Sequence, residues 1–189
     1  MGSNMAECHP VGFQWVMEAK LKGAPVIHVD PRFTRTSASA SFHVPIRPGS
    51  DIAFLGGIVN YILENRRWFE DYVVHYTNAA SILRDDFRDA EELDGFFSGW
   101  DADRQQYDMS SWQYAGQEPI SAAAGYRPGR ATRSETTGAL GGPVPGEPQR
   151  DLTLQHPRCV FQVLRRHFKR YTPEVVETTC GVPRELFLG

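Results

Sequence analysis

The chain has 189 residues, 41% of them apolar and 23% charged, a composition typical of ordinary soluble globular proteins, which excludes wholesale disorder. Its formal net charge of −3 is too close to balance for the basic footprint of a nucleic-acid binder, so nucleic acid is not expected as a partner. The scattered cysteines Cys8, Cys159 and Cys180 form neither a disulfide framework nor a CxxC metal site, and the longest apolar run, 52–63, is too short to cross a membrane.

Apolar periodicity and cap residues predict a series of secondary-structure elements. Helices are expected where apolar residues recur at helical spacing after Pro, Ser, Asn or Thr. In chain order they cover 10–22, 50–63, 67–75, 78–84, 160–171 and a short segment after Thr172. Short β-branched runs predict strands at 25–29 and 43–46. The expected fold class is therefore α/β, with a partial Rossmann-like parallel sheet and flanking helices.

The composition changes between residues 115 and 150. This stretch has seven glycines, five prolines and almost no large apolar residue, so it cannot repay the entropy of ordering by burial. We expect an α/β part over 1–114, a Gly/Pro-rich surface insertion over 115–150 and a helical continuation of the same domain over 151–189. A parallel βαβ unit would place a strand before the helix that follows residue 2, so we expect a fragment of a larger domain.

Three short polar segments are expected to meet at the carboxyl edge of the sheet. They are the loop 2–4, the strand end 30–34 and the turn 49–51. Ligands of open α/β sheets bind at this edge, where small residues let backbone amides approach a phosphate. The spacing predicts a nucleotide site, although the first loop lacks a full GxGxxG pattern. The alternative is that 49–51 is a plain helix start.

Other candidate residues favour structural roles. Cys8-His9 follows the first loop and is expected to serve packing and capping, and His156 with Cys159 lacks the further partners of a zinc site. Basic residues near 165–170 predict a solvated or subunit-facing surface, and the four tryptophans are expected to be core or half-buried anchors.

Several motifs together resemble the molybdopterin oxidoreductase family. Within that family they are most similar to the large catalytic subunit of respiratory formate dehydrogenases. The likeness extends over nearly the whole chain except the Gly/Pro-rich insertion. The segments that carry it are MGSNMAECHPVG (1–12), DPRFTRT (30–36), PIRPGSDIA (45–53), YTNAA (76–80), TLQHPRCV (153–160) and RYTPEVVE (170–177).

The resemblance implies a bis(molybdopterin guanine dinucleotide) cofactor that holds molybdenum or tungsten, with 1–114 and 151–189 forming part of the domain around one guanine dinucleotide. The expected cofactor contacts are Gly2, Ser3, Asn4, Glu7, Asp30, Arg32, Thr34, Gly49 and Asp51. Among them, the amides near Ser3 and Asn4 would bind pyrophosphate, Arg32 a phosphate or the guanine face, and Asp51 the guanine edge. No catalytic residue and no metal ligand is assigned within the chain.

The resemblance also implies an activity and partners. The parent enzyme would oxidise formate to carbon dioxide, with a selenocysteine or cysteine metal ligand and an iron-sulfur cluster upstream of this chain, which alone is expected to be inactive. Its partners would be the rest of the catalytic subunit, an iron-sulfur electron-transfer subunit and a membrane cytochrome subunit, in a periplasmic, membrane-associated complex used in anaerobic respiration. The alternatives are another molybdopterin oxidoreductase, such as a nitrate reductase, and a non-catalytic stand-alone nucleotide-binding module.

Overall fold

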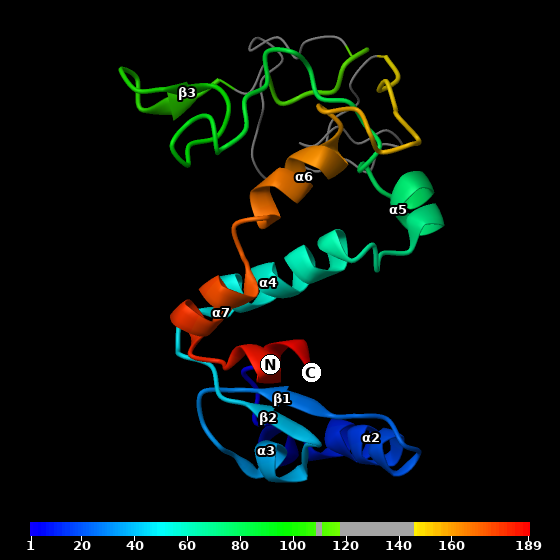
Figure 1. Cartoon of the computed structure of the whole chain (residues 1–189), viewed down its shortest axis with the longest axis vertical. Coiled ribbons are helices and arrows are strands. Elements are labelled where there is room, and N and C mark those ends of the chain that lie inside the picture. Colours follow the sequence, from blue (N-terminus) through cyan, green and yellow to red (C-terminus); the bar gives the residue numbers. More distant parts are fainter. Residues whose placement is uncertain (109–110, 118–145) are drawn as a thin grey trace. The chain divides into compact units, whose positions relative to one another are not determined.

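A computed structural model describes residues 1–108, 111–117 and 146–189, and divides them into two compact units (Figure 1). The first unit combines Met1–Arg66 with Phe168–Gly189, and the second is Arg67–His167. Most of the Gly/Pro-rich segment predicted as a surface insertion, residues 118–145, lies outside the described residues. The predicted division of the chain into three parts therefore stays a prediction.

The first unit has a parallel pair of strands flanked by helices, which confirms the α/β class. Strands β1 and β2 align residue for residue, with His28 opposite His43. The elements are α1 (Met5–Cys8), α2 (Pro10–Leu21), β1 (Ile27–Val29), α3 (Arg35–Ser39), β2 (Phe42–Val44), α4 (Asp51–Glu64), α7 (Pro173–Cys180) and α8 (Arg184–Leu188). Both predicted strands and the helices predicted after Pro10, Ser50 and Thr172 are present. The short helices α1, α3 and α8 were not predicted.

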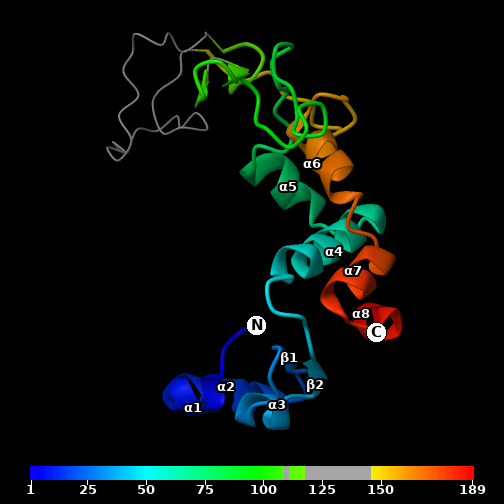
Figure 2. The ribbon, with the colours of Figure 1, turned by 90° about the vertical axis from the view of Figure 1, so that its left-hand side faces the viewer.

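The core of this unit lies on one face of the strand pair. Val29 and Val44 pack there against buried residues of α4 and α7, while α1, α2 and α3 lie on the other side of the strands (Figures 1 and 2). Because side chains alternate along a strand, His28 and His43 point to the α3 side, with ring centroids 5.9 Å apart. The core members are Val29, Val44, Ile46, Ala53, Phe54, Val176, Cys180 and Val182, with Tyr171 and Phe187 packed against them.

Helix α2 confirms the element predicted after Pro10, but none of its residues is buried. Trp15 is 66% exposed, so the expectation that all four tryptophans are core or half-buried anchors is wrong for this one. The other three are half-buried. Helical spacing predicted the helix but not its burial. Among the described residues, nothing packs over the outer side of α2 closely enough to bury it.

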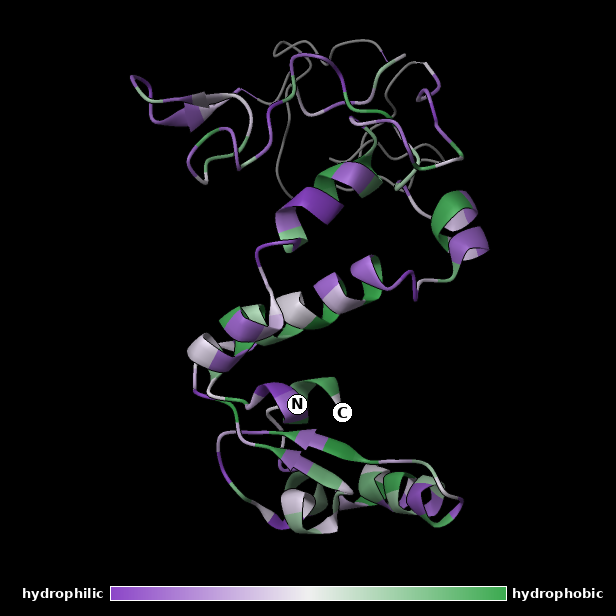
Figure 3. Cartoon of the chain, in the orientation of Figure 1, coloured by the Kyte–Doolittle hydropathy of each residue, from purple (hydrophilic) through white to green (hydrophobic). Residues whose placement is uncertain are grey.

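The second unit contains α5 (Glu70–Tyr76), a hairpin of β3 (Trp100–Asp101) and β4 (Gln106–Tyr107), and all of α6 (Val160–Phe168) but its last residue. Figure 3 shows α6 hydrophobic at its start and hydrophilic toward its end, as its sequence VFQVLRRHF requires. The prediction of a helix at 78–84 is wrong. Residues 81–83 are extended and form isolated bridges with Arg150, Cys159 and Tyr114, distant partners that satisfy the backbone groups a helix would have paired locally.

Candidate functional site

The first predicted segment, 2–4, lies beside the carboxyl end of β1. The Gly2 amide donates to the Val29 carbonyl (2.9 Å), and His28 Nε2 lies 3.1 Å from the Ser3 carbonyl oxygen. Gly2 has a positive φ of 62°, and open space surrounds the position where a Cβ would stand. A glycine is favoured here because the backbone conformation is one that L side chains rarely adopt.

Asn4 and Glu7 extend this loop and are tied to α3. The Asn4 side-chain amide donates to the Glu7 carboxylate, and Asn4 Oδ1 accepts a hydrogen bond from the Thr36 hydroxyl (3.0 Å). Glu7 also forms an ion pair with Arg35 (3.2 Å). The side chains of Asn4 and Glu7 therefore both have partners within the protein.

The second segment, 30–34, forms the turn between β1 and α3. Asp30 is buried, and its Oδ1 accepts the Arg32 amide (2.8 Å), while the Thr34 amide donates to Ser37 Oγ (2.9 Å) at the start of α3. These contacts use Asp30 to shape the turn and place Thr34 at the helix start. The Arg32 guanidinium is exposed and has no hydrogen-bond or ion-pair partner among the described residues.

The third segment, 49–51, follows β2 and opens α4. Gly49 has a φ of 81°, Ser50 Oγ donates to the Arg47 carbonyl (2.7 Å), and Asp51 is the exposed first residue of the helix. Within the described part of the chain, no hydrogen bond or ion pair joins this turn to 2–4 or 30–34. The structure thus connects the first two segments only through β1 and α3, because 2–4 contacts His28, Val29 and Thr36, and no hydrogen bond or ion pair among the described residues joins 2–4 directly to 30–34. The third segment follows the neighbouring strand of the same sheet.

The assembled groups are suited to binding an anion. The backbone amides of Ser3 and Asn4 have no acceptor among the described residues. Arg32 lies in the turn before α3, and α3 also contacts the loop that carries Ser3 and Asn4. Amides and a guanidinium are donors that phosphate oxygens accept, whereas Asp51 offers acceptors at an exposed helix start. This donor set favours recognition of a phosphate-bearing ligand.

Three buried polar residues beneath this loop were missed by sequence reasoning. His28, Thr36 and Ser37 are each at most 5% exposed, and all three contact the 3–6 loop or the 32–34 turn. Signals in the sequence could have found two of them, His28 and Ser37. His28 interrupts an otherwise apolar β-branched strand, and Thr34 with Ser37 has the spacing of a helix-start hydrogen-bond pair.

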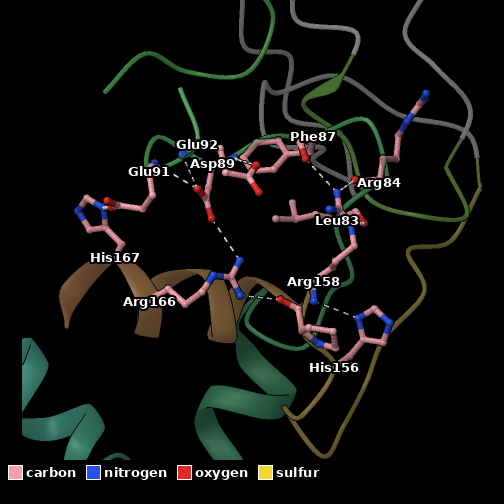
Figure 4. Close-up of polar contacts among 11 residues, drawn as sticks. Leu83, Arg84, Phe87, Asp89, Glu91, Glu92, His156, Arg158, Arg166 and His167 are labelled. Atoms are coloured by element: carbon pink, nitrogen blue, oxygen red, sulfur yellow. Dashed lines mark hydrogen bonds and ion pairs between the residues drawn. The ribbon is translucent and has the colours of Figure 1, made fainter. Parts of the chain in front are cut away.

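A polar cluster in the second unit connects the segment before α6 and the last turn of α6 to the loop 83–92 (Figure 4). The Arg158 guanidinium donates to the carbonyls of Leu83, Arg84 and Phe87, the last at 3.0 Å. Arg166 pairs with Asp89 (3.2 Å), and His167 Nδ1 lies 3.0 Å from a Glu91 carboxylate oxygen. Because the Arg158 and Arg166 donors are directed at protein carbonyls and a carboxylate, we assign this cluster to loop positioning.

Asp151 organises the turn that precedes α6. Its carboxylate accepts the Thr153 hydroxyl (2.6 Å) and the amides of Thr153, Gln155 and His156. Led by the Thr153 hydroxyl bond, these contacts lower the pKa of Asp151 from 3.8 to about 2. They fix the backbone on which His156 and Arg158 stand.

Cysteine and histidine in the described ranges do not gather into a metal site. Cys159 is fully buried, and burial raises the pKa of its thiol, while His156 Nδ1 accepts the Arg158 amide (3.2 Å). Among the described residues, no three His, Cys, Asp or Glu side chains are grouped to hold a metal ion. Likewise, no helix in the described part of the chain is long and apolar enough to span a membrane.

No family model matches the chain. It is, however, 48% identical over 189 residues to the formate dehydrogenase, nitrate-inducible, major subunit of Escherichia coli, and 45% identical over 188 residues to the formate dehydrogenase subunit alpha of Megalodesulfovibrio gigas. Each match takes in 100% of this chain. These matches over the whole chain support a fragment of a molybdopterin oxidoreductase catalytic subunit of the formate dehydrogenase type. It spans 16% of the length of these relatives.

Five formate dehydrogenase subunits match 99% or 100% of this chain, whereas an F420-dependent formate dehydrogenase subunit matches 44% of it and two nitrate reductases match 44% and 57%. The assimilatory nitrate reductase catalytic subunit of Bacillus subtilis is 37% identical over only 83 residues, 44% of the chain. The comparison therefore favours the formate dehydrogenase family over the nitrate reductase alternative.

Proposed function

We propose that this chain is part of a catalytic subunit that oxidises formate to carbon dioxide with a bis(molybdopterin guanine dinucleotide) cofactor. The observation that carries the proposal is the 45–48% identity to formate dehydrogenase subunits over the whole chain. In this proposal the chain forms part of the wall around one guanine dinucleotide, and β1 and β2 belong to a larger Rossmann-like sheet.

The donors beside β1 support this assignment. A pyrophosphate carries negative charge on oxygens that accept hydrogen bonds, and the amides of Ser3 and Asn4 together with the exposed Arg32 supply donors of the required kind. Gly2 leaves its Cβ position open, so a ligand can approach the backbone closely. We therefore assign Ser3 and Asn4 to the pyrophosphate and Arg32 to a phosphate or the guanine face.

The remaining candidate residues divide into contacts and supports. Asp51, exposed at the start of α4, would accept hydrogen bonds from the guanine edge, and Gly49 would let the turn before it approach the base. Asp30 and Thr34 would hold the turn that presents Arg32. Glu7 would fix the Asn4 side-chain amide, which donates to its carboxylate.

When bound, the cofactor supplies the metal-centred redox chemistry by which formate yields carbon dioxide, a proton and two electrons. Molybdenum or tungsten, the metal ligand and an iron-sulfur cluster would be held by other parts of the catalytic subunit. That subunit would also cover exposed apolar residues of α2 such as Val11 and Trp15. Iron-sulfur and membrane cytochrome subunits would carry the electrons onward in a periplasmic complex.

The proposal is tested in the intact holoenzyme with Arg32→Gln, compared with Arg66→Gln. Arg66 is also exposed and lies just beyond α4, so the control makes the same charge change away from the donors. The measurements are guanine nucleotide released by acid per polypeptide, metal content, and formate-dependent reduction of an artificial electron acceptor. Loss of one charge-assisted contact is expected to lower cofactor retention about tenfold or more in Arg32→Gln only.

Wild-type enzyme without guanine nucleotide, or without formate oxidation, would overturn the proposed function. Equal loss of cofactor in both variants would instead mean that Arg32 acts only through general surface charge. A soluble chain that binds guanine nucleotide in an assembly with no metal and no formate oxidation would favour the stand-alone module.

A further inference from the structure

The hydrogen bonds beneath the first loop point to a function for three residues outside the family motifs' expected contacts. His28, Thr36 and Ser37 are 3%, 5% and 5% exposed, so their polar atoms are removed from water. Burying polar side chains costs free energy unless each finds a partner, and all three find partners in the two segments that carry Ser3, Asn4 and Arg32.

Thr36 holds the loop at two points through one hydroxyl. Its Oγ1 accepts the Ala6 amide (2.9 Å) and donates to Asn4 Oδ1 (3.0 Å). Since a hydroxyl can donate and accept at once, this single group fixes both the backbone at residue 6 and the orientation of the Asn4 side-chain amide. The Asn4 Nδ2 atom is thereby directed to Glu7.

His28 and Ser37 connect the same loop to the Arg32 turn. A carbonyl only accepts hydrogen bonds, so His28 Nε2 carries the proton that it donates to Ser3 (3.1 Å). His28 Nδ1 lies 2.8 Å from Ser37 Oγ, and Ser37 Oγ accepts the Thr34 amide (2.9 Å). A continuous chain of hydrogen bonds thus runs from Ser3 to the turn after β1.

We propose that Thr36, His28 and Ser37 are positioning residues that hold the Ser3–Asn4 amides and Arg32 in one arrangement for a shared diphosphate. The inference rests on the proposed function. Their contacts involve the Ser3 carbonyl and the Asn4 side chain, but they leave the backbone amides of Ser3 and Asn4 without an acceptor among the described residues. The network therefore orders the loop without occupying the donors that a pyrophosphate would need.

The experiment compares Thr36→Val with Thr36→Ser in the intact holoenzyme. Valine keeps the shape of threonine but loses both hydrogen bonds, whereas serine keeps the hydroxyl. Thr178→Val is the matched control, because the Thr178 hydroxyl only donates to the Glu174 carbonyl of its own helix (2.8 Å). We expect the guanine dinucleotide to dissociate about tenfold faster from Thr36→Val, the scale of two lost hydrogen bonds, and wild-type retention in Thr36→Ser and Thr178→Val.

Hydrogen exchange of the cofactor-free enzyme separates positioning from loss of stability. A positioning role predicts faster exchange in peptide 2–9 of Thr36→Val and unchanged exchange in peptide 53–63 of α4. Faster exchange in both peptides, wild-type cofactor retention in Thr36→Val, or failure of serine to restore retention would each overturn the inference. If Thr36→Val does not accumulate, His28→Met and His28→Gln provide the same comparison, since only glutamine can still donate to Ser3.

The two proposals fail in different ways. Wild-type holoenzyme without guanine dinucleotide refutes the proposed function, and this inference with it. Dinucleotide retained equally by wild type and Thr36→Val refutes the positioning role alone.

Discussion

At the scale of single residues, Asp151 shows how one carboxylate can determine a loop. Both of its oxygens accept hydrogen bonds, which come from the Thr153 hydroxyl and from the backbone amides of Thr153, Gln155 and His156. Hydrogen bonds to the charged form favour ionisation, which is why its pKa falls to about 2. The turn that leads into α6 is therefore linked to pH.

Acidification is expected to weaken this turn. The unfolded chain takes up the Asp151 proton near pH 3.8 and the folded chain only near pH 2, so the stabilisation is complete above pH 3.8 and is lost as pH falls toward 2. Urea unfolding between pH 2 and 6 should show a shallower loss of stability in Asp151→Asn than in wild type. Asp103→Asn, at an exposed position outside the turn, is the control, and identical pH slopes in Asp151→Asn and wild type would contradict the assignment.

At the scale of elements, the close approach of α4 and α7 depends on glycine. A Cβ on Gly57 would lie 2.4 Å from Val176 Cγ2, and one on Gly56 would lie 2.7 Å from the Tyr171 ring. Since Val176 is fully buried and packed, it has no room to move away. The absence of side chains at two successive helical positions is what lets this interface form.

Gly57→Ala is expected to destabilise the first unit by roughly 1–3 kcal/mol through overpacking. This exceeds the gain of up to about 1 kcal/mol that alanine has over glycine in a helix. Gly12→Ala is the matched control, because its Cβ would meet only the flexible end of Met5 at 2.8 Å. Thermal or urea unfolding should find the control neutral or more stable, and an equal effect of both substitutions would argue against the α4–α7 packing.

Elements with strong local signals were predictable, and elements defined by distant partners were not. Helix α4 has a long apolar pattern after a turn, and α7 has Thr172 as its cap, with the Val175 amide donating to the Thr172 hydroxyl (3.3 Å). The segment 78–84 has a cap residue and apolar spacing too, but its backbone pairs with residues 114, 150 and 159. The secondary-structure propensity of a segment cannot predict a backbone pairing partner that lies far away in the sequence.

At the scale of the whole molecule, the candidate contacts are confined to one unit. All nine residues expected to contact the cofactor, from Gly2 to Asp51, lie in the first unit, whereas the Asp151 turn and the Arg158 cluster lie in the second. We therefore assign ligand binding to the first unit and loop positioning around α6 to the second.

Hydrogen exchange should reflect this division. Removing the cofactor from the holoenzyme is expected to speed exchange in peptides covering 2–9, 30–36 and 49–52, because the ligand would no longer restrain them. Peptide 96–107, from the β3–β4 hairpin of the second unit, is expected to be unchanged and serves as the internal control. Strong protection of 96–107 by the cofactor would place a contact in the second unit and contradict the assignment.

The sequence by itself determined the elements that have strong local signals, and it predicted the residues of the expected site. Short β-branched runs predicted both strands of the first unit, and apolar spacing with cap residues predicted its longer helices. The polar segments predicted a nucleotide site at the carboxyl edge of the sheet. Only the tertiary structure revealed that Asp30 and Thr34 serve the turn, that Arg32 remains exposed, and that His28, Thr36 and Ser37 lie beneath the loop. Local periodicity is encoded within a few residues, whereas burial and hydrogen-bond partners depend on segments about thirty positions apart, such as Asn4 and Thr36.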